Sequence, residues 1–274
     1  MGWRQRQPNI SMTQSTALRL TGLSKRFGSV VATDDVSLTL EKGEVLALLG
    51  ENGAGKTTLM NMLFGHYLPD AGTVEVADES GTLQSLPLGH PQAALAAGVG
   101  MVHQHFALAE NINTLDNITL GSEPLRSFRR NRNSAKAKID GIIERSGLNA
   151  PLNVPVGRLS VGERQRVEIL KALYRDARIL VLDEPTAVLT PQEADTLFDN
   201  IKTMTEDGLS VIFISHKLRE VLAFSDRIAV LRHGKKVGEM ATADADEKVI
   251  ARMMVGADTP KVARTEMAPG TPLL

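Results

Sequence analysis

Hydrophobic residues near the start of the chain alternate with polar ones. Leu18 and Leu20 follow this period of two, and so do Val36, Leu38 and Leu40. Such alternation is typical of strands with one buried face. The sequence therefore predicts two half-buried strands before residue 41.

Three later runs are apolar throughout and indicate strands buried on both faces. These runs are Val45–Leu49, Ile179–Leu182 and Val211–Ile214. Between them, the spacing of apolar residues predicts helices over Lys56–Phe64 and Pro191–Thr205. Alternation of buried strands with helices is typical of a parallel sheet covered by helices. The predicted fold class is therefore α/β.

Shorter signals indicate strands outside that alternation. Val74 and Val76 predict an edge strand, and Gln84–Pro91 reads as a loop. A hairpin is expected where Arg227–Leu231 and Lys235–Met240 flank a His-Gly turn.

The middle and the ends of the chain differ from the rest. Residues 92–178 have helical patterns, such as Ala135–Ser146 and Glu163–Tyr174, and few strand signals, so we expect a helical subdomain there. Residues 1–15 are predicted to be a disordered leader, and residues 256–274, rich in Pro, a linker or disordered tail.

Composition excludes several function classes. The 274 residues include no cysteine, which excludes disulfides, thiolate metal sites and cysteine nucleophiles. A net charge of −1 and only 4% aromatic residues argue against a nucleic-acid partner. No run reaches the roughly 18 apolar residues that span a bilayer.

A glycine-rich segment between the first buried strand and the next helix matches the phosphate-loop pattern G-x-x-x-x-G-K-[ST]. Glycines let successive backbone N–H groups point at phosphate oxygens, and the helix N-terminus adds its positive dipole end. Lys56 supplies a charge to the phosphates, and the Thr57 hydroxyl can ligate Mg²⁺. The expected nucleotide-binding residues are Gly50, Glu51, Asn52, Gly53, Ala54, Gly55, Lys56, Thr57 and Thr58.

A second motif is an apolar strand that ends in two carboxylates, Asp183 and Glu184. An ordinary pair of edge carboxylates is the alternative interpretation. Because the strand follows a phosphate loop in the same predicted sheet, we favour a catalytic role. Asp183 is then expected to hold Mg²⁺ and Glu184 to polarise an attacking water.

A third motif, Leu159–Arg166, opens a predicted helix. Ser160 and Glu163 have the spacing of a capping box, and Ser160 with Gly162 at a helix N-terminus can also bind an anion. Two separate phosphate sites in one chain fit a protein that binds its own nucleotide and one held by a partner.

Together these motifs resemble the ATP-binding cassette (ABC) ATPases over residues 16–255. Leu159–Arg166 resembles the ABC signature, with Val161 and Glu163 in place of the commoner Gly and Gln. The resemblance implies a P-loop ABC-ATPase fold with a parallel-sheet core, an antiparallel β edge subdomain and the helical subdomain. It also implies ATP and Mg²⁺ as ligands and a second cassette as partner.

The resemblance adds residues that spacing alone would not single out. His216, which could otherwise be an ordinary strand-end histidine, resembles the switch histidine that acts with Glu184. Gln104 resembles the glutamine that senses Mg²⁺ and couples to the membrane partner, and Phe27 the aromatic residue that stacks on adenine. Thr190 occupies the position where the family usually has an Asp.

Finer resemblance indicates ATPases of bacterial simple-sugar and nucleoside importers. It is carried by His103–Phe106, Ser160–Tyr174 and Glu184–Glu193. It implies transmembrane permease subunits as partners, an extracytoplasmic solute-binding protein acting indirectly, and a peripheral position on the cytoplasmic face of the bacterial inner membrane. Half of a tandem ATPase, a truncated product and a homodimer remain alternatives, as does a regulatory or non-transport ABC protein.

Overall fold

A six-stranded sheet forms the centre of the computed structural model, which describes residues 15–104, 106–122 and 132–256. The strands are β3 (Val45–Leu49), β6 (Val99–Val102), β7 (Ile179–Asp183), β8 (Ser210–Ile214), β9 (Arg227–Arg232) and β10 (Lys235–Ala241). They lie in the order β10-β9-β3-β8-β7-β6, parallel from β9 to β6, with β10 antiparallel to β9. The parallel sheet and the hairpin are therefore confirmed.

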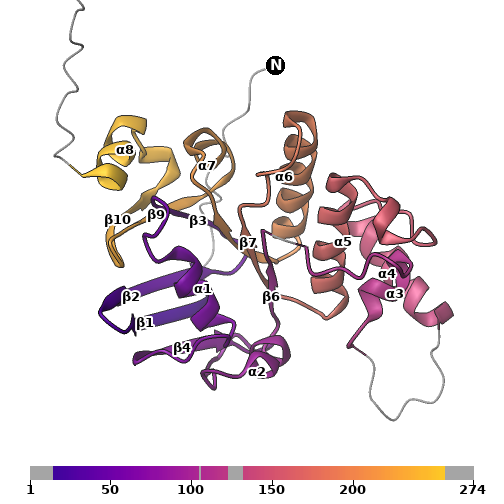
Figure 1. The fold of residues 1–274 in the computed structure, drawn as a ribbon, viewed down its shortest axis with the longest axis horizontal. Coiled ribbons are helices and arrows are strands. Elements are labelled where there is room, and N and C mark those ends of the chain that lie inside the picture. The colour runs from indigo at the N-terminus through magenta and orange to yellow at the C-terminus, as the bar shows by residue number, and fades with distance from the viewer. Residues whose placement is uncertain (1–14, 105, 123–131, 257–274) are drawn as a thin grey trace, which may run out of the picture.

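A second sheet of four antiparallel strands lies beside the first (Figure 1). Its strands are β1 (Thr16–Phe27), β2 (Val30–Glu41), β4 (Ala71–Ala77) and β5 (Leu83–Ser85), in the order β2-β1-β4-β5. This sheet is the expected antiparallel subdomain.

Eight α-helices are found in the described residues, and two single turns of 3₁₀ helix lie at Val156–Arg158 and Thr242–Asp244. Figure 1 shows α3, α4 and α5 together in a helical lobe at one end of the molecule. The helices are α1 (Lys56–Leu63), α2 (Pro91–Ala96), α3 (Thr114–Thr119), α4 (Arg132–Ser146), α5 (Val161–Tyr174), α6 (Pro191–Glu206), α7 (Leu218–Phe224) and α8 (Glu247–Val255).

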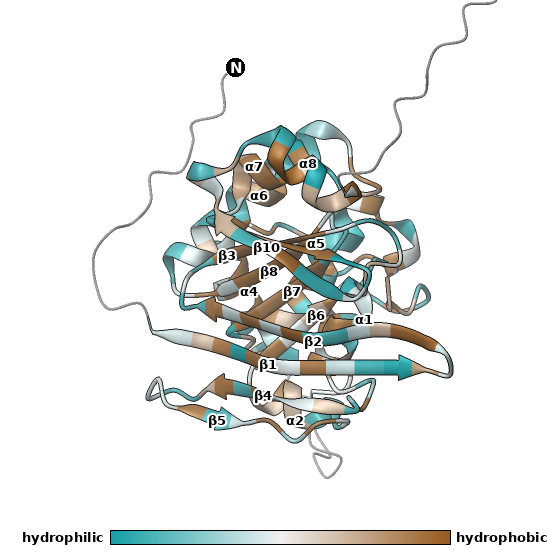
Figure 2. Cartoon of the chain, turned by 90° about the vertical axis from the view of Figure 1, so that its left-hand side faces the viewer, coloured by the Kyte–Doolittle hydropathy of each residue, from teal (hydrophilic) through white to brown (hydrophobic). Residues whose placement is uncertain are grey.

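The central sheet is buried on both faces, because the inner positions of its parallel strands β3, β7 and β8 are all apolar (Figure 2). Along β3, Val45, Ala47 and Leu49 belong to the core shared with α5 and α6, whereas Leu46 and Leu48 belong to the core shared with α1 and the antiparallel sheet. The sheet thereby holds its strand ends, and the loops that follow them, at one edge.

Three short-strand predictions need correction. β4 is not an edge strand, because β5 pairs with it, and β5 includes residues 84 and 85 of the predicted loop. β6 is a central-sheet strand within the segment predicted to be helical. It has four residues, and Gly100 packs on Ala172 and Ala177 of distant segments, so the local pattern gave no signal.

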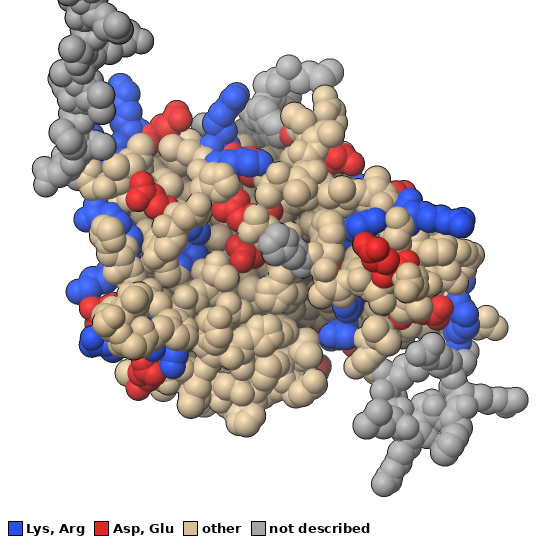
Figure 3. Space-filling model, in the orientation of Figure 1, with Lys and Arg blue, Asp and Glu red and all other residues tan. Residues whose placement is uncertain are grey.

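The predictions for the two ends fall largely outside the described residues, which exclude 1–14 and 257–274. Within the parts of the chain that are described, no helix has the length and apolar character needed to cross a membrane. Figure 3 shows basic and acidic side chains interspersed over one face, in agreement with the net charge of −1.

Candidate functional site

The loop between β3 and α1 needs glycine at both of its ends. Gly50 has φ 156° and Gly55 φ 100°, backbone conformations that other residues rarely adopt. A Cβ at Gly50 would collide with the carbonyl oxygen of Leu231, and one at Gly55 with that of Ala32. The glycines therefore allow the loop to fit between β9 and β2 and to direct its backbone inward.

Lys56, the first residue of α1, is buried and spans this loop. Its Nζ donates to the carbonyl oxygens of Gly50 at 2.7 Å and Glu51 at 3.0 Å. Burial lowers the pKa of the Lys56 ammonium, and the nearby carboxylates of Glu184 and Asp183 oppose that shift. The ammonium thus lies between the phosphate loop and the acidic end of β7.

Asp183, the last residue of β7, is buried, and the Thr57 side chain lies close enough to lower the pKa of its carboxyl. Burial raises the pKa of Asp183, with a further contribution from Glu184, and Lys56 and His103 partly counteract the rise. A hydroxyl and a carboxylate brought together in this way are hard oxygen donors that suit Mg²⁺.

Glu184 and His216 follow neighbouring parallel strands, and the structure joins their side chains. His216 Nδ1 lies 2.8 Å from Glu184 Oε1. The other oxygen of Glu184, Oε2, is buried and has no hydrogen-bond partner within the described residues. Glu184 also has φ 49°, a left-handed conformation that is uncommon outside glycine and recurs at functional sites.

The predicted capping box at α5 is confirmed. Ser160 Oγ accepts from the backbone N–H of Glu163 at 3.2 Å, and Glu163 Oε2 accepts from the Ser160 N–H at 2.7 Å. Ser160 is exposed, whereas Gly162 is buried against the carboxylate of Glu193, where a Cβ would collide with Oε1. The two predicted anion-binding residues thus begin a helix of the helical lobe, away from α1 (Figure 1).

Thr190 caps α6 in a second capping box, made with Glu193. Its hydroxyl donates to Glu193 Oε2 at 2.9 Å, and the same oxygen accepts from the Thr190 N–H at 3.0 Å. These hydrogen bonds hold the pKa of Glu193 below its ordinary value. The hydroxyl at position 190 therefore supplies the helix cap that an Asp would provide.

Phe27 and Gln104 belong to different sheets: Phe27 ends β1 of the antiparallel sheet, and Gln104 follows β6 of the central sheet. Phe27 ends β1, is 44% exposed and packs edge-on against Tyr67, with 5.3 Å between ring centroids. It pairs with Val30, and Ala32 two residues later contacts Gly55, so the hairpin end lies next to the phosphate loop. Gln104 is exposed and follows β6, which pairs with β7.

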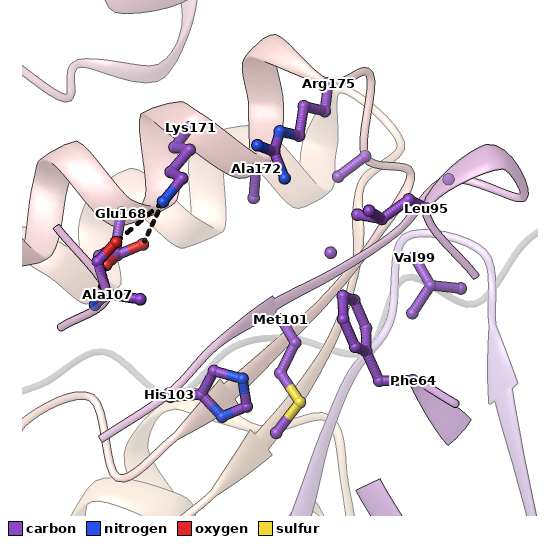
Figure 4. A pocket seen from close by; sticks show the side chains of 13 residues that line it. Phe64, Leu95, Val99, Met101, His103, Ala107, Glu168, Lys171, Ala172 and Arg175 are labelled. Atoms are coloured by element: carbon purple, nitrogen blue, oxygen red, sulfur yellow. Dashed lines mark hydrogen bonds and ion pairs between the residues drawn. The ribbon is translucent and has the colours of Figure 1, made fainter. Parts of the chain in front are cut away.

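A small groove of about 100 Å³, partly open to solvent, separates β6 from the helical lobe. Figure 4 shows its apolar side formed by Phe64, Leu95 and Met101. Its polar side is formed by Glu168 and Lys171 of α5, which form an ion pair at 4.0 Å, and by Arg175 just after that helix. The groove borders the strand that leads to Gln104 and the helix that begins after Ser160. A single side chain or helix bound in the groove could therefore contact both β6 and α5.

Sequence reasoning missed four residues around the group: Thr186, Glu193, Lys217 and Glu220. Lys217 donates to the carbonyl oxygen of Thr186, and the Thr186 hydroxyl donates to Glu220. For Glu193 the spacing Thr190-x-x-Glu193 was an available capping-box signal. Lys217 and Glu220 are three residues apart and match no motif, and Thr186 meets them only because β7 and β8 are adjacent strands.

P-loop proteins are defined by a buried parallel sheet in which a glycine-rich loop connects a strand to a helix that begins with lysine. The loop between β3 and α1 has this arrangement. The ABC transporter family matches residues 33–187, and the chain belongs to that family.

Similar curated proteins support membership of the ABC transporter family. The chain is 44% identical over 89% of its length to the nucleoside import ATP-binding protein NupA of Lactococcus lactis, and 46% identical over 88% to the ribose import ATP-binding protein RbsA 2 of Burkholderia ambifaria. The glucose import ATP-binding protein TsgD13 of Haloferax volcanii is 44% identical over 96% of this chain. The chain spans about half the length of these relatives, at 47%, 47% and 52%.

Solved structures confirm the fold. MJ1267, an ATP-binding cassette of an ABC transporter in its ADP conformation, superposes with a TM-score of 0.74 at 26% identity. The match covers 88% of this chain and 96% of that one. The α/β P-loop ABC-ATPase fold is therefore confirmed.

Proposed function

We propose that this chain is the ATP-binding and ATP-hydrolysing subunit of an importer that energises uptake of a nucleoside or simple sugar. The observation that carries the proposal is the convergence of Lys56, Asp183, Glu184 and His216 at one edge of the central sheet. A charged donor, a carboxylate for a cation and a carboxylate–imidazole pair are the groups that phosphoryl transfer to water requires.

Each group has a role in that reaction. The phosphate loop and Lys56 bind the β- and γ-phosphates, and Thr57 with Asp183 would hold Mg²⁺. When bound, Mg²⁺ supplies neutralisation of phosphate charge. Glu184, whose Oε2 is buried and free to accept a proton, orients the attacking water, and His216 holds the opposite carboxylate oxygen.

A second cassette would complete the site. Ser160 is exposed at the start of α5 in the helical lobe, and α5 lies away from α1, which follows the phosphate loop of the same chain (Figure 1). Two neighbouring residues expected at such an interface, Val161 and Val188, expose 42% and 54% of their surface. We infer that the α5 N-terminus binds the γ-phosphate of ATP held by the partner cassette.

The groove beside β6 is the proposed docking site for a permease. Its apolar floor suits a short helix of the permease. Lys171 and Arg175 outnumber the one carboxylate of the groove, Glu168, and suit an acidic residue on that helix. A permease helix that moves in the groove would displace β6, which leads to Gln104, and α5, which begins after Ser160. Docking to a permease would place the chain peripherally at the cytoplasmic face of a bacterial membrane, with a solute-binding protein acting indirectly.

Assays of ATP hydrolysis in the reconstituted complex test the proposal. The chain, reconstituted with a candidate nucleoside or sugar permease, is expected to hydrolyse ATP faster when a solute-binding protein loaded with ribose or guanosine is added. ATP binding with no hydrolysis, alone or with the permease, would instead favour a regulatory or non-transport protein. A rate of ATP hydrolysis that does not change when the permease is added would exclude the transport role.

A further inference from the structure

The loops after β7 and β8 are joined twice, and only one of the two links involves the hydrolytic pair. The first link is the contact between Glu184 and His216. The second is made by Thr186, Lys217 and Glu220. Lys217 Nζ donates to the Thr186 carbonyl oxygen at 3.0 Å and forms an ion pair with Glu220 Oε1 at 3.1 Å.

The hydroxyl of Thr186 closes this second link. Thr186 is 1% exposed, its Oγ1 donates to Glu220 Oε2 at 2.7 Å, and Lys217 Nζ lies 3.2 Å from the same Oγ1. An ammonium, a hydroxyl and a carboxylate therefore satisfy one another, in a partly buried position where charge-assisted hydrogen bonds are strong.

The same carboxylate reaches the residue before His216. Ser215 Oγ lies 3.5 Å from Glu220 Oε2 and accepts from the Lys217 N–H at 3.0 Å. The backbone is thus held on both sides of His216. This matters because the His216 side chain is 55% exposed, whereas that of Glu184 is 12% exposed, so packing around its own side chain does little to fix the His216 ring.

We propose that Thr186, Lys217 and Glu220 are positioning residues that keep the His216 ring in contact with Glu184. They hold the two loops in register without touching the nucleotide. The proposal rests on the proposed function, in which the Glu184–His216 pair orients the attacking water. A displacement of about 1 Å in such a pair can reduce turnover by up to a hundredfold.

The first test reads the contact itself and does not depend on turnover. In the isolated full chain, the ¹⁵N resonance of His216 Nδ1 reports its hydrogen bond to Glu184. In Lys217→Met and in Thr186→Val, which removes the hydroxyl at constant volume, this resonance is expected to move towards its position in Glu184→Gln. An unchanged resonance in both folded variants would overturn the proposal.

The second test is a kinetic cycle in the permease-bound complex. Lys217→Met is expected to lower kcat at least tenfold with the KM for ATP changed less than about twofold, and Thr186→Ser to keep near-wild-type turnover. In a His216→Ala background, Lys217→Met should have little further effect. An equal loss in both backgrounds, or a loss confined to KM, would contradict the proposal.

Failure of the proposed function has a different signature. If Glu184→Gln kept normal turnover, the hydrolytic assignment would be wrong whatever Lys217→Met does to the His216 resonance. Thermal unfolding of each variant separates local displacement from misfolding. Lys217 is 39% exposed, so its substitution is the variant least disruptive to folding.

Discussion

His216 Nδ1 lies 2.8 Å from Glu184 Oε1, and this contact joins two residues that follow different strands of the central sheet. β7 and β8 are parallel neighbours, and the Glu184 N–H donates to the Ile214 carbonyl oxygen at 3.0 Å. The C-terminal ends of β7 and β8 are therefore aligned, with Asp183 paired with Ile214, and the loops that follow the two strands lie next to each other. Adjacent parallel strands thus create the pair to which we assign the attacking water.

Replacement of Glu184 by Gln is expected to preserve ATP binding and abolish turnover. Gln has the same shape but cannot accept the proton of the attacking water, so the rate should fall by about 10²–10⁴-fold. Steady-state hydrolysis and fluorescent-nucleotide binding measure the two effects, and gel filtration with ATP should show a dimer that persists. Near-normal hydrolysis would show that Glu184 is not the base.

Replacement of Phe27 by Ala is expected to weaken ATP binding about fivefold to tenfold, through loss of about 1 kcal/mol of stacking on the base. Inorganic tripolyphosphate, which has no base, should bind both proteins equally. Calorimetric titration with both ligands measures this, and Phe27→Trp serves as the control that retains a ring. Equal losses for the two ligands would exclude a base contact.

Replacement of Thr190 by Ala should lower the free energy of unfolding by about 1 kcal/mol at pH 7, because α6 loses its cap. Thr190→Asp keeps an N-cap acceptor and is expected to stay near wild type. Chemical denaturation of the three proteins measures the difference. A wild-type value for Thr190→Ala would contradict the capping role.

The Thr190–Glu193 contact also predicts a pH dependence. Hydrogen bonds from Thr190 hold the pKa of Glu193 below its ordinary value of 4.5. Their contribution to stability is therefore present above 4.5 and is lost as the pH falls through the lowered pKa. The difference between Thr190→Ala and wild type should shrink below about pH 4. A constant difference across that range would exclude this titration.

Replacement of Gly162 by Ala is expected to destabilise the wild type and to stabilise a Glu193→Ala background. Ala is normally better than Gly in a helix by about 0.5–1 kcal/mol, but here its Cβ would collide with the Glu193 carboxylate. Gly141 in α4 is a matched control, because a Cβ there would meet nothing within 4 Å. Gly141→Ala should be neutral or stabilising in both backgrounds.

Replacement of Lys171 by Gln is expected to reduce retention of the permease several-fold in detergent pull-downs, because the groove loses a charge that attracts an acidic partner residue. Gln keeps a donor for the Ala107 carbonyl oxygen, which Lys171 contacts at 3.1 Å. Lys248→Gln, on exposed α8, is the control. Equal retention of both variants would place the docking surface elsewhere.

Local sequence was sufficient wherever one segment determines its own structure. Val45–Leu49 forms a strand with the predicted bounds, because five consecutive apolar residues can be accommodated only between two covering layers. The loop from Gly50 to Thr57 and the capping box at Ser160 were likewise predictable, because their hydrogen bonds join residues a few positions apart. β6 was not, because four residues carry too little pattern.

The sequence by itself determined the phosphate loop, the buried strands and the acidic end of β7, together with the family that these motifs indicate. Only the tertiary structure decided that His216 contacts Glu184, that Lys217 ties Thr186 to Glu220, and that Glu193 lies against Gly162. The physical reason is sequence separation. The pairs Glu184–His216 and Thr186–Lys217 are 32 and 31 residues apart, and they meet because the parallel sheet aligns its strand ends. Gly162 and Glu193 meet because α5 and α6 pack on the same core.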